Sequence, residues 1–172
     1  VLRRVAGAVG IVERHEARGD RRGFGAAYGD LDNDGDLDYV VNNINDPASI
    51  FRNNAVAGTQ DDDRGDRTNG WLSIKLRGDS LNPMGLGTWI EIQYGDKQKQ
   101  VWEHSIYRGY LSSMQALAHF GLGKNEVVDK LIITWPNQKQ QILTQVKANQ
   151  VLDIKYRDAK VNQAPPPPPI QP

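Results

Sequence analysis

The sequence predicts an all-β protein whose main part is a β-sandwich or a barrel. Short segments of alternating apolar and polar residues are separated by turn signals, as in "IEIQYGDK". No long segment shows the 3.6-residue apolar period of an amphipathic helix. We therefore expect short strands, most of which bury one face of a sheet.

The first part of the chain predicts a small β-segment between two irregular stretches. Residues 1–22 are rich in arginine and glycine and predict a weak strand or an irregular lead-in. Residues 23–54 predict three strands, with an acidic loop between the first two. Residues 55–69 have almost no large apolar side chains and predict an acidic linker. The three strands are expected at residues 24–28, 37–43 and 48–54.

Residues 70–156 contain a dense series of strand patterns and predict the main β domain. Large apolar side chains alternate along most of these segments, which is typical of half-buried strands. Segment 127–135 is apolar and branched enough to be buried on both faces. The strands are expected at residues 71–77, 88–94, 98–105, 127–135, 139–143 and 151–156.

Residues 157–172 form a proline-rich tail with five consecutive prolines. Such a run favours a stiff polyproline II conformation, which cannot pair in a sheet. The tail is therefore expected to be a linker, with an SH3-type ligand as the alternative.

The composition excludes several classes of function. Lysine plus arginine and aspartate plus glutamate each number 21, so no global field favours nucleic acid or an anionic membrane. The absence of cysteine excludes disulfides, thiolate metal sites and cysteine catalysis. No apolar run is long enough to span a bilayer. Because the chain begins with Val1 rather than Met, we expect a mature part or a fragment of a larger protein.

The stretch "GDLDNDGDLD" (29–38) concentrates five aspartates in ten residues and predicts a calcium site. Its pattern is D-x-D-x-D-G-x-x-D, in which alternate carboxylates can point at one centre and Gly35 permits a sharp turn. Ca²⁺ accepts six to eight oxygen ligands, whereas Mg²⁺ prefers to keep its waters. The expected side-chain ligands are Asp30, Asp32, Asp34 and Asp38, and Asp36 contributes its backbone carbonyl while its side chain points outward.

This loop departs from an EF-hand. Position 12 is Val41 rather than glutamate, and the flanking segments predict strands rather than helices. The sequence therefore indicates a calcium loop in a β-hairpin, closed by Asp38. The alternative is a solvated acidic turn that binds no ion.

The stretch "FGAAYGDLDNDGDLDYVVNN" (24–43) resembles the FG-GAP repeat, also called the VCBS-type repeat. That family places the same calcium loop between two strands of a β-propeller blade. A propeller closes with about four to eight blades, and this chain supplies at most one. The resemblance leaves two alternatives: a piece of a longer propeller protein, or a blade-like sheet that packs on the β domain.

Three segments, 69–92, 108–141 and 146–154, together resemble the ASPIC and UnbV domain. The elements "HFGLG" (119–123), "VD…TWP" (128–136) and "NQ" (149–150) follow in the family's order. That domain commonly follows FG-GAP repeats in secreted and surface proteins. The resemblance implies an extracytoplasmic, non-catalytic interaction protein.

The triplet Arg-Gly-Asp occurs at 18–20, 64–66 and 77–79. Such a triplet suits integrin-type adhesion, and Arg64, Gly65 and Asp66 have the most polar surroundings. These residue types are also common in loops and turns, which is the alternative.

Trp89 and Trp102 are candidates for a glycan-stacking surface. Trp89 is out of phase with Ile90 and Ile92, and Trp102 is out of phase with Val101, so both could lie on the outer face of the sheet. The alternative is a second buried face, because such rings bury large areas.

No catalytic residues are expected. His15, His104 and His119 are dispersed without zinc-ligand spacing, and His119 is expected to be structural, oriented by a turn carbonyl. Ser112 and Ser113 precede His119 but lie in no nucleophile motif.

The sequence thus predicts a non-catalytic, calcium-binding module for protein or glycan interaction at the cell surface, with Ca²⁺ in a structural role. The expected location is extracellular or in the cell envelope, on the outer-membrane surface or in the periplasm. The alternatives are an accessory domain of a secreted metal-assisted hydrolase and Arg-Gly-Asp-mediated adhesion. No nucleic-acid partner and no membrane span are expected, and the oligomeric state stays open.

Overall fold

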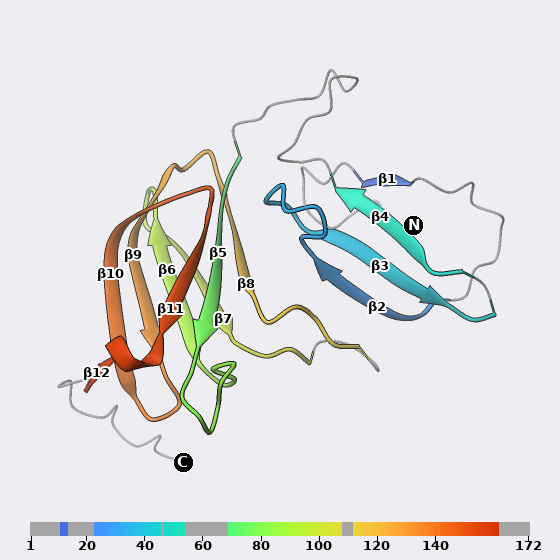
Figure 1. Ribbon diagram of the computed structural model, residues 1–172. Coiled ribbons are helices and arrows are strands. Elements are labelled where there is room, and N and C mark those ends of the chain that lie inside the picture. Colours follow the sequence, from blue (N-terminus) through green and yellow to red (C-terminus); the bar gives the residue numbers. More distant parts are fainter. Residues whose placement is uncertain (1–10, 14–22, 46, 54–68, 108–111, 162–172) are drawn as a thin grey trace, which may run out of the picture.

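The computed structural model describes residues 11–13, 23–45, 47–53, 69–107 and 112–161. These residues form twelve strands and one short 3-10 helix, η1 (Tyr156–Asp158), so the prediction of an all-β protein is confirmed. The strands make three sheets, one in the N-terminal part and two in the main domain (Figure 1).

The N-terminal sheet has four antiparallel strands in the order β1-β4-β3-β2. Three of them coincide with the expected strands to within one residue at each end. The short strand β1 lies in the stretch expected to be a weak strand or irregular, and it pairs with β4. The bounds are β1 (Ile11–Glu13), β2 (Gly23–Gly29), β3 (Asp38–Asn43) and β4 (Ser49–Asn53).

The main domain is a sandwich of a five-stranded and a three-stranded sheet. The first sheet has the order β12-β10-β9-β6-β7, and the second has the order β11-β5-β8, with β11 parallel to β5. The bounds are β5 (Gly70–Arg77), β6 (Trp89–Tyr94), β7 (Gln98–Glu103), β8 (Ala118–Gly123), β9 (Val127–Thr134), β10 (Lys139–Lys147), β11 (Gln150–Lys155) and β12 (Lys160–Val161).

The apolar core lies between these two sheets. The three-stranded sheet contributes Leu72, Ile74 and Phe120, and the five-stranded sheet contributes residues such as Ile90 and Leu131. Only one face of the central strand β9 is fully buried: Val128, Leu131 and Ile133 are buried and the residues between them are not, and the pairing with β6 shifts register between Val128 and Lys130. The expectation that this strand is buried on both faces was therefore wrong, because only its inner face meets another sheet.

Two strands were not predicted. Strand β8 contains two glycines, Gly121 and Gly123, and therefore lacks a run of β-formers. Strand β12 lies in the segment expected to be part of the tail, and it pairs with Lys139 and Gln140 at the start of β10.

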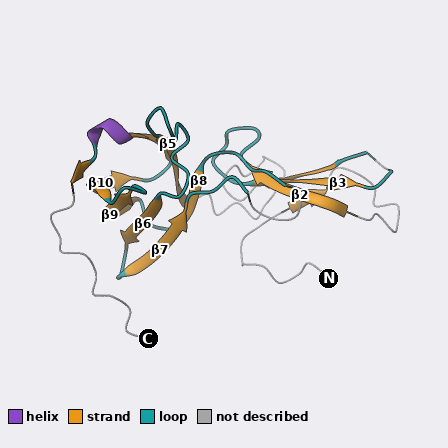
Figure 2. Ribbon diagram, turned by 90° about the horizontal axis from the view of Figure 1, so that it is seen from below, coloured by secondary structure: helices purple, strands orange, loops and turns teal. Residues whose placement is uncertain are grey.

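The four-stranded sheet stands beside the sandwich, and the acidic loop between β2 and β3 lies on the side that faces β5 and β8 (Figures 1 and 2). The backbone N–H of Ala26 on β2 donates to the Ser112 hydroxyl of the main domain at 3.2 Å. No helix among the described residues is long and apolar enough to cross a membrane.

Candidate metal centre

The acidic loop leaves β2 at Gly29 and enters β3 at Asp38, and these two residues pair across the hairpin. The Asp30 carboxylate accepts the backbone N–H groups of Asp34 and Gly35, both at 3.1 Å. Asn33 and Gly35 both have positive φ, 60° and 97°, so the chain turns back sharply between the carboxylates. The sharp turn that the sequence predicted at Gly35 is present.

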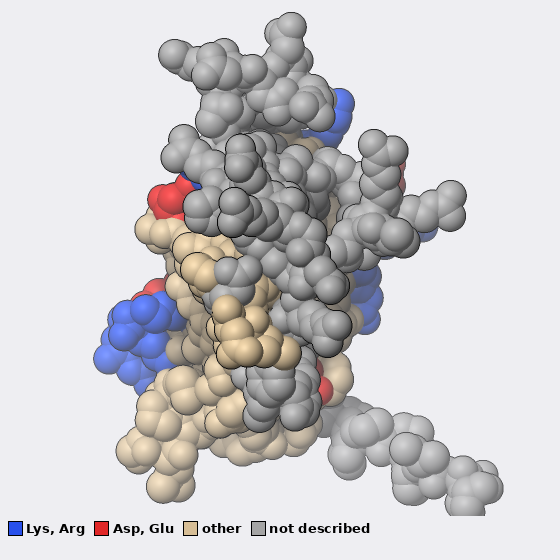
Figure 3. All heavy atoms as spheres, turned by 90° about the vertical axis from the view of Figure 1, so that its right-hand side faces the viewer, with Lys and Arg blue, Asp and Glu red and all other residues tan. Residues whose placement is uncertain are grey.

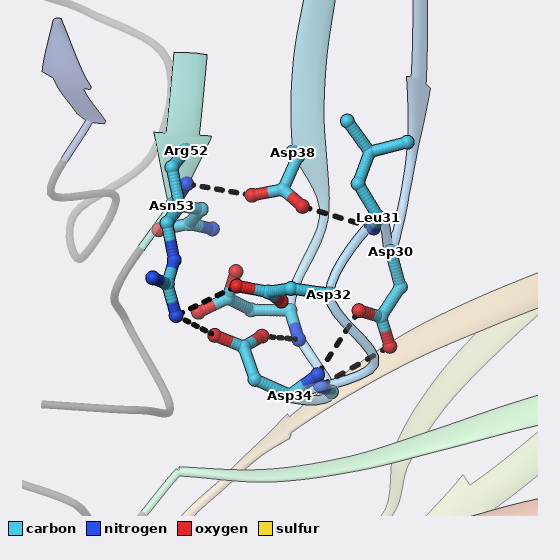
Figure 4. Close-up of polar contacts among 9 residues, drawn as sticks. Asp30, Leu31, Asp32, Asp34, Asp38, Arg52 and Asn53 are labelled. Carbon is cyan, nitrogen blue, oxygen red and sulfur yellow. Dashed lines mark hydrogen bonds and ion pairs between the residues drawn. The ribbon is translucent and has the colours of Figure 1, made fainter. Parts of the chain in front are cut away.

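Asp38 ties the loop to the rest of the four-stranded sheet. One of its carboxylate oxygens accepts the N–H of Leu31 at 2.9 Å, and the other accepts the N–H of Asn53 on β4 at 2.8 Å (Figure 4). The residue is only 2% exposed. Its charge is therefore held in place by two backbone donors from different segments.

Three carboxylates gather as a metal site would require. One oxygen each of Asp30, Asp32 and Asp38 lie within 4.8 Å of one another. Two oxygens bound to the same Ca²⁺ at 2.3–2.6 Å are at most about 5.2 Å apart, so the observed spacing fits this ion. The donor set consists entirely of hard oxygens, which Ca²⁺ and Mg²⁺ prefer.

Asp34 is not in this group of three. Its Oδ1 accepts the N–H of Asp36 at 3.1 Å, and its Oδ2 lies 3.6 Å from Arg52 Nη2. The same Arg52 nitrogen is 2.6 Å from Asp32 Oδ2, so the guanidinium bridges two loop carboxylates (Figure 4). No local pattern in the sequence points to Arg52, because only the pairing of β4 with β3 brings it to the loop.

Asp36 differs from the expectation. Its side chain was expected to point outward, but the residue is only 4% exposed. The neighbouring residue Gly35 packs against the indole ring of Trp71 in the main domain, so this part of the loop does not face open solvent.

The electrostatics of the loop disfavour the ionised forms of Asp30 and Asp34 without a cation. Burial raises the pKa of both Asp30 and Asp34 above the usual value, and nearby loop carboxylates raise it further. Backbone hydrogen bonds to each carboxylate act in the opposite direction. Because folding raises the pKa of both carboxyl groups, their ionisation at higher pH lowers the stability of the folded state. A bound cation would offset this loss of stability.

The two tryptophans proposed for glycan stacking lie on opposite faces. Trp89 is 50% exposed on the outer face of the five-stranded sheet. Trp102 pairs with Ile90 across β6 and β7, packs against the core and meets Phe120 edge-on at 6.4 Å between ring centroids. The two rings do not share an exposed face, because Val101 and not Trp102 is the exposed residue of that pair, and for Trp102 the alternative of a buried face holds.

The described Arg-Gly-Asp triplet has local structural roles. The Arg77 guanidinium nitrogen Nε lies 2.8 and 2.6 Å from the two oxygens of Asp153. Asp79 accepts the N–H groups of Leu81 and Asn82, both at 3.0 Å. The triplets at 18–20 and 64–66, including Arg64, Gly65 and Asp66, lie outside the described residues.

His119 lies at the surface of the sandwich that faces the acidic loop. Its Nδ1 forms a hydrogen bond with the Ser73 hydroxyl at 2.8 Å rather than with a turn carbonyl, and its ring stacks on Trp71. Burial lowers the pKa of His119 to about 4. His104 is buried within the sandwich, and His15 lies outside the described residues.

Charge is mixed on the face of the molecule that includes the four-stranded sheet. Figure 3 shows acidic and basic side chains of described residues next to each other at its margin, and other described residues in its lower part. This pattern offers no broad basic field of the kind that binds nucleic acid, within the part of the surface that the structure describes.

Comparisons with known proteins match most of the main domain to one family model. The family model "ASPIC and UnbV" matches residues 78–161. Cartilage acidic protein 1 of Xenopus tropicalis is 31% identical over 142 residues, which cover 80% of this chain and 20% of that protein. The Homo sapiens protein of the same name is 30% identical over 152 residues, covering 85% of this chain and 21% of that protein.

The likeness to these relatives extends beyond the segment that the family model matches. The chain spans about a fifth of the length of these curated relatives. Residues 78–161 therefore match the ASPIC and UnbV family model, and the chain is similar to part of cartilage acidic protein 1.

Proposed function

We propose that this protein is a non-catalytic, calcium-binding module for protein or glycan interaction outside the cytoplasm. The observation that carries the proposal is the cluster of Asp30, Asp32 and Asp38 oxygens within a D-x-D-x-D-G-x-x-D loop. The four-stranded sheet would then correspond to one FG-GAP-type unit in front of the ASPIC and UnbV domain. The name of the relatives refers to cartilage, which supports an extracellular location.

In this proposal the cation has a structural role. Asp30, Asp32 and Asp38 would hold it, and Asp34 and the Asp36 carbonyl are further candidate ligands. Ca²⁺ suits the site better than Mg²⁺ because the loop offers many oxygens in an irregular arrangement, whereas Mg²⁺ needs near-octahedral geometry and keeps its waters. The positive charge would offset the repulsion among the carboxylates and hold the hairpin connection in one conformation.

Isothermal titration of the full chain with Ca²⁺ and, separately, with Mg²⁺ tests the proposal. We expect one Ca²⁺ site in the wild type, weaker Mg²⁺ binding, and loss of the Ca²⁺ site in Asp32→Asn. Asp153→Asn is the matched control, because Asp153 is also an exposed partner of an arginine but lies on β11. Absence of Ca²⁺ binding by the wild type at millimolar concentrations would contradict the proposal.

A further inference from the structure

We propose that Trp71 is a positioning residue for the acidic loop, so that cation binding in the loop and docking of the loop on the main domain favour each other. This inference rests on the proposed calcium site. It assigns a role to a residue outside the loop that supplies no metal ligand. It also makes the contact between the acidic loop and the main domain dependent on calcium.

The first observation is the contact between Gly35 and Trp71. A Cβ atom added to Gly35 would overlap the indole ring at Nε1 and Cε2, so only glycine lets the loop backbone approach the ring this closely. Gly35 also needs its φ of 97° for the turn of the loop. One residue thus serves both the shape of the loop and its contact with the main domain.

The second observation is that Trp71 is held firmly. Its backbone N–H donates to the Asn149 side chain at 3.1 Å, and its carbonyl accepts the Asn149 N–H at 2.6 Å. Its indole stacks on His119 with ring centroids 6.0 Å apart and planes 16° apart. His119 is in turn hydrogen-bonded to Ser73. The ring is therefore a preformed surface rather than a side chain that follows the loop.

The third observation is that the contact continues along β2. Ala26 donates to the Ser112 hydroxyl, and Gly29 lies beside the Gln115 side chain. Between Tyr28, Leu37, Trp102 and Met114 only a cavity of about 10 Å³ remains. The strand before the loop and the tip of the loop thus both contact the main domain.

These contacts predict a thermodynamic linkage. Gly35 lies between Asp34 and Asp36, so a cation that orders the loop also orders the backbone that contacts Trp71. If calcium favours docking, docking must raise calcium affinity by the same factor, because the coupling free energy between two equilibria is reciprocal. Removal of the Trp71 ring should therefore weaken calcium binding although no ligand is changed.

The experiment is Ca²⁺ titration of the full chain as wild type, Trp71→Ala, Trp71→Phe and Trp89→Ala. We expect Trp71→Ala to weaken binding by about 5-fold to 150-fold, the range of typical coupling free energies. Trp71→Phe should recover part of the affinity, because a smaller ring still offers Gly35 a surface. Trp89→Ala is the control, since this exposed tryptophan lies on the outer face of the other sheet.

A second measurement keeps the inference testable if Trp71→Ala does not fold. Hydrogen exchange on the wild type should slow at Trp71, Ser73 and His119 when Ca²⁺ is added, and should not change at Leu131 in the core. Unchanged exchange at these three residues, or equal affinities for wild type and Trp71→Ala, overturns the inference while the proposed function stands. Absence of Ca²⁺ binding by the wild type overturns both.

Discussion

The sandwich and the four-stranded sheet are stabilised by different kinds of side chain. Every fully buried hydrophobic residue among those described lies between Leu72 and Ile154, in the sandwich. The buried side chains described in the four-stranded sheet and its acidic loop are all polar: Asp36, Asp38, Asn43, Ser49 and Asn53. The sandwich should therefore depend on apolar packing, whereas the four-stranded sheet should depend on hydrogen bonds, charge and, as proposed, a cation.

The largest expected effect comes from the core of the sandwich. Leu131→Ala removes a fully buried side chain of the central strand β9 and should destabilise the protein by about 2–5 kcal/mol. Ile142→Ala on the neighbouring strand β10 is the control, because its side chain is exposed and its loss should change stability by less than about 0.5 kcal/mol. Urea unfolding measures both, and equal costs would contradict the assigned core.

A smaller effect is expected from pH at the boundary between the two regions. The folded pKa of His119 is lowered to about 4 by burial, whereas an unfolded histidine titrates near 6.5. As pH falls from about 6.5 to about 4, the unfolded chain binds a proton that the folded chain does not. Stability should fall by about 2–3 kcal/mol over this range.

Urea unfolding of the wild type and His119→Gln at several pH values tests this prediction. The variant keeps a hydrogen-bonding group for Ser73 and should lose this part of the pH dependence. The raised pKa values of Asp30 and Asp34 act in the opposite direction and remain in both proteins, so they form a common background. The same slope in both proteins would contradict the assignment to His119.

A third prediction concerns the four-stranded sheet alone. Asp38→Ala leaves the N–H groups of Leu31 and Asn53 without their carboxylate acceptor and should cost about 1–3 kcal/mol. Hydrogen exchange should become faster at these two amides and stay unchanged at Ile90 in the sandwich. Asp153→Ala, which breaks an exposed ion pair with Arg77, should cost less than about 1 kcal/mol. Faster exchange across the whole sandwich in Asp38→Ala would show that the two regions do not differ as described.

The smallest expected effect involves Arg52, which is half exposed and pairs with Asp32 and Asp34. A cation must compete with this guanidinium for the same carboxylates. An exposed ion pair contributes about 0–1 kcal/mol, so Arg52→Gln should tighten Ca²⁺ binding by up to about fivefold. Arg77→Gln is the control and should leave the affinity unchanged. Weaker Ca²⁺ binding in Arg52→Gln would contradict competition.

The strands could largely be predicted from the sequence, because alternation reports directly on which face is buried. Leu72, Ile74 and Leu76 alternate in the sequence and all lie in the core. Alternation fails where two neighbours are both apolar: at Val101 and Trp102 only the pairing of Trp102 with Ile90 decides which residue faces inward. Strand β8 was missed although Ala118, Phe120 and Leu122 alternate and are buried, because the glycines in this segment are weak β-formers.

The acidic loop could be located from its spacing, but its details depend on distant segments. The carboxylates of Asp30, Asp32 and Asp38 come together as the pattern predicted. Asp34 does not join them in the structure: one of its oxygens accepts the N–H of Asp36, and the other lies 3.6 Å from Arg52 of β4. The burial of Asp36 accompanies a contact with Trp71, which is 36 residues away from Gly35 in the sequence. Contacts of this kind leave no trace in local spacing.

The central claim is that a cation stabilises the four-stranded sheet while apolar packing stabilises the sandwich. The most direct test is a thermal unfolding scan of the wild type and Asp32→Asn with Ca²⁺, with Mg²⁺ and with a chelator. Ca²⁺ at a hundred times its dissociation constant should stabilise the wild type by about 2.7 kcal/mol, raising its unfolding midpoint by several degrees. A midpoint that rises only with Ca²⁺, and not in the variant, is the expected result, whereas midpoints insensitive to either metal would contradict a structural calcium site.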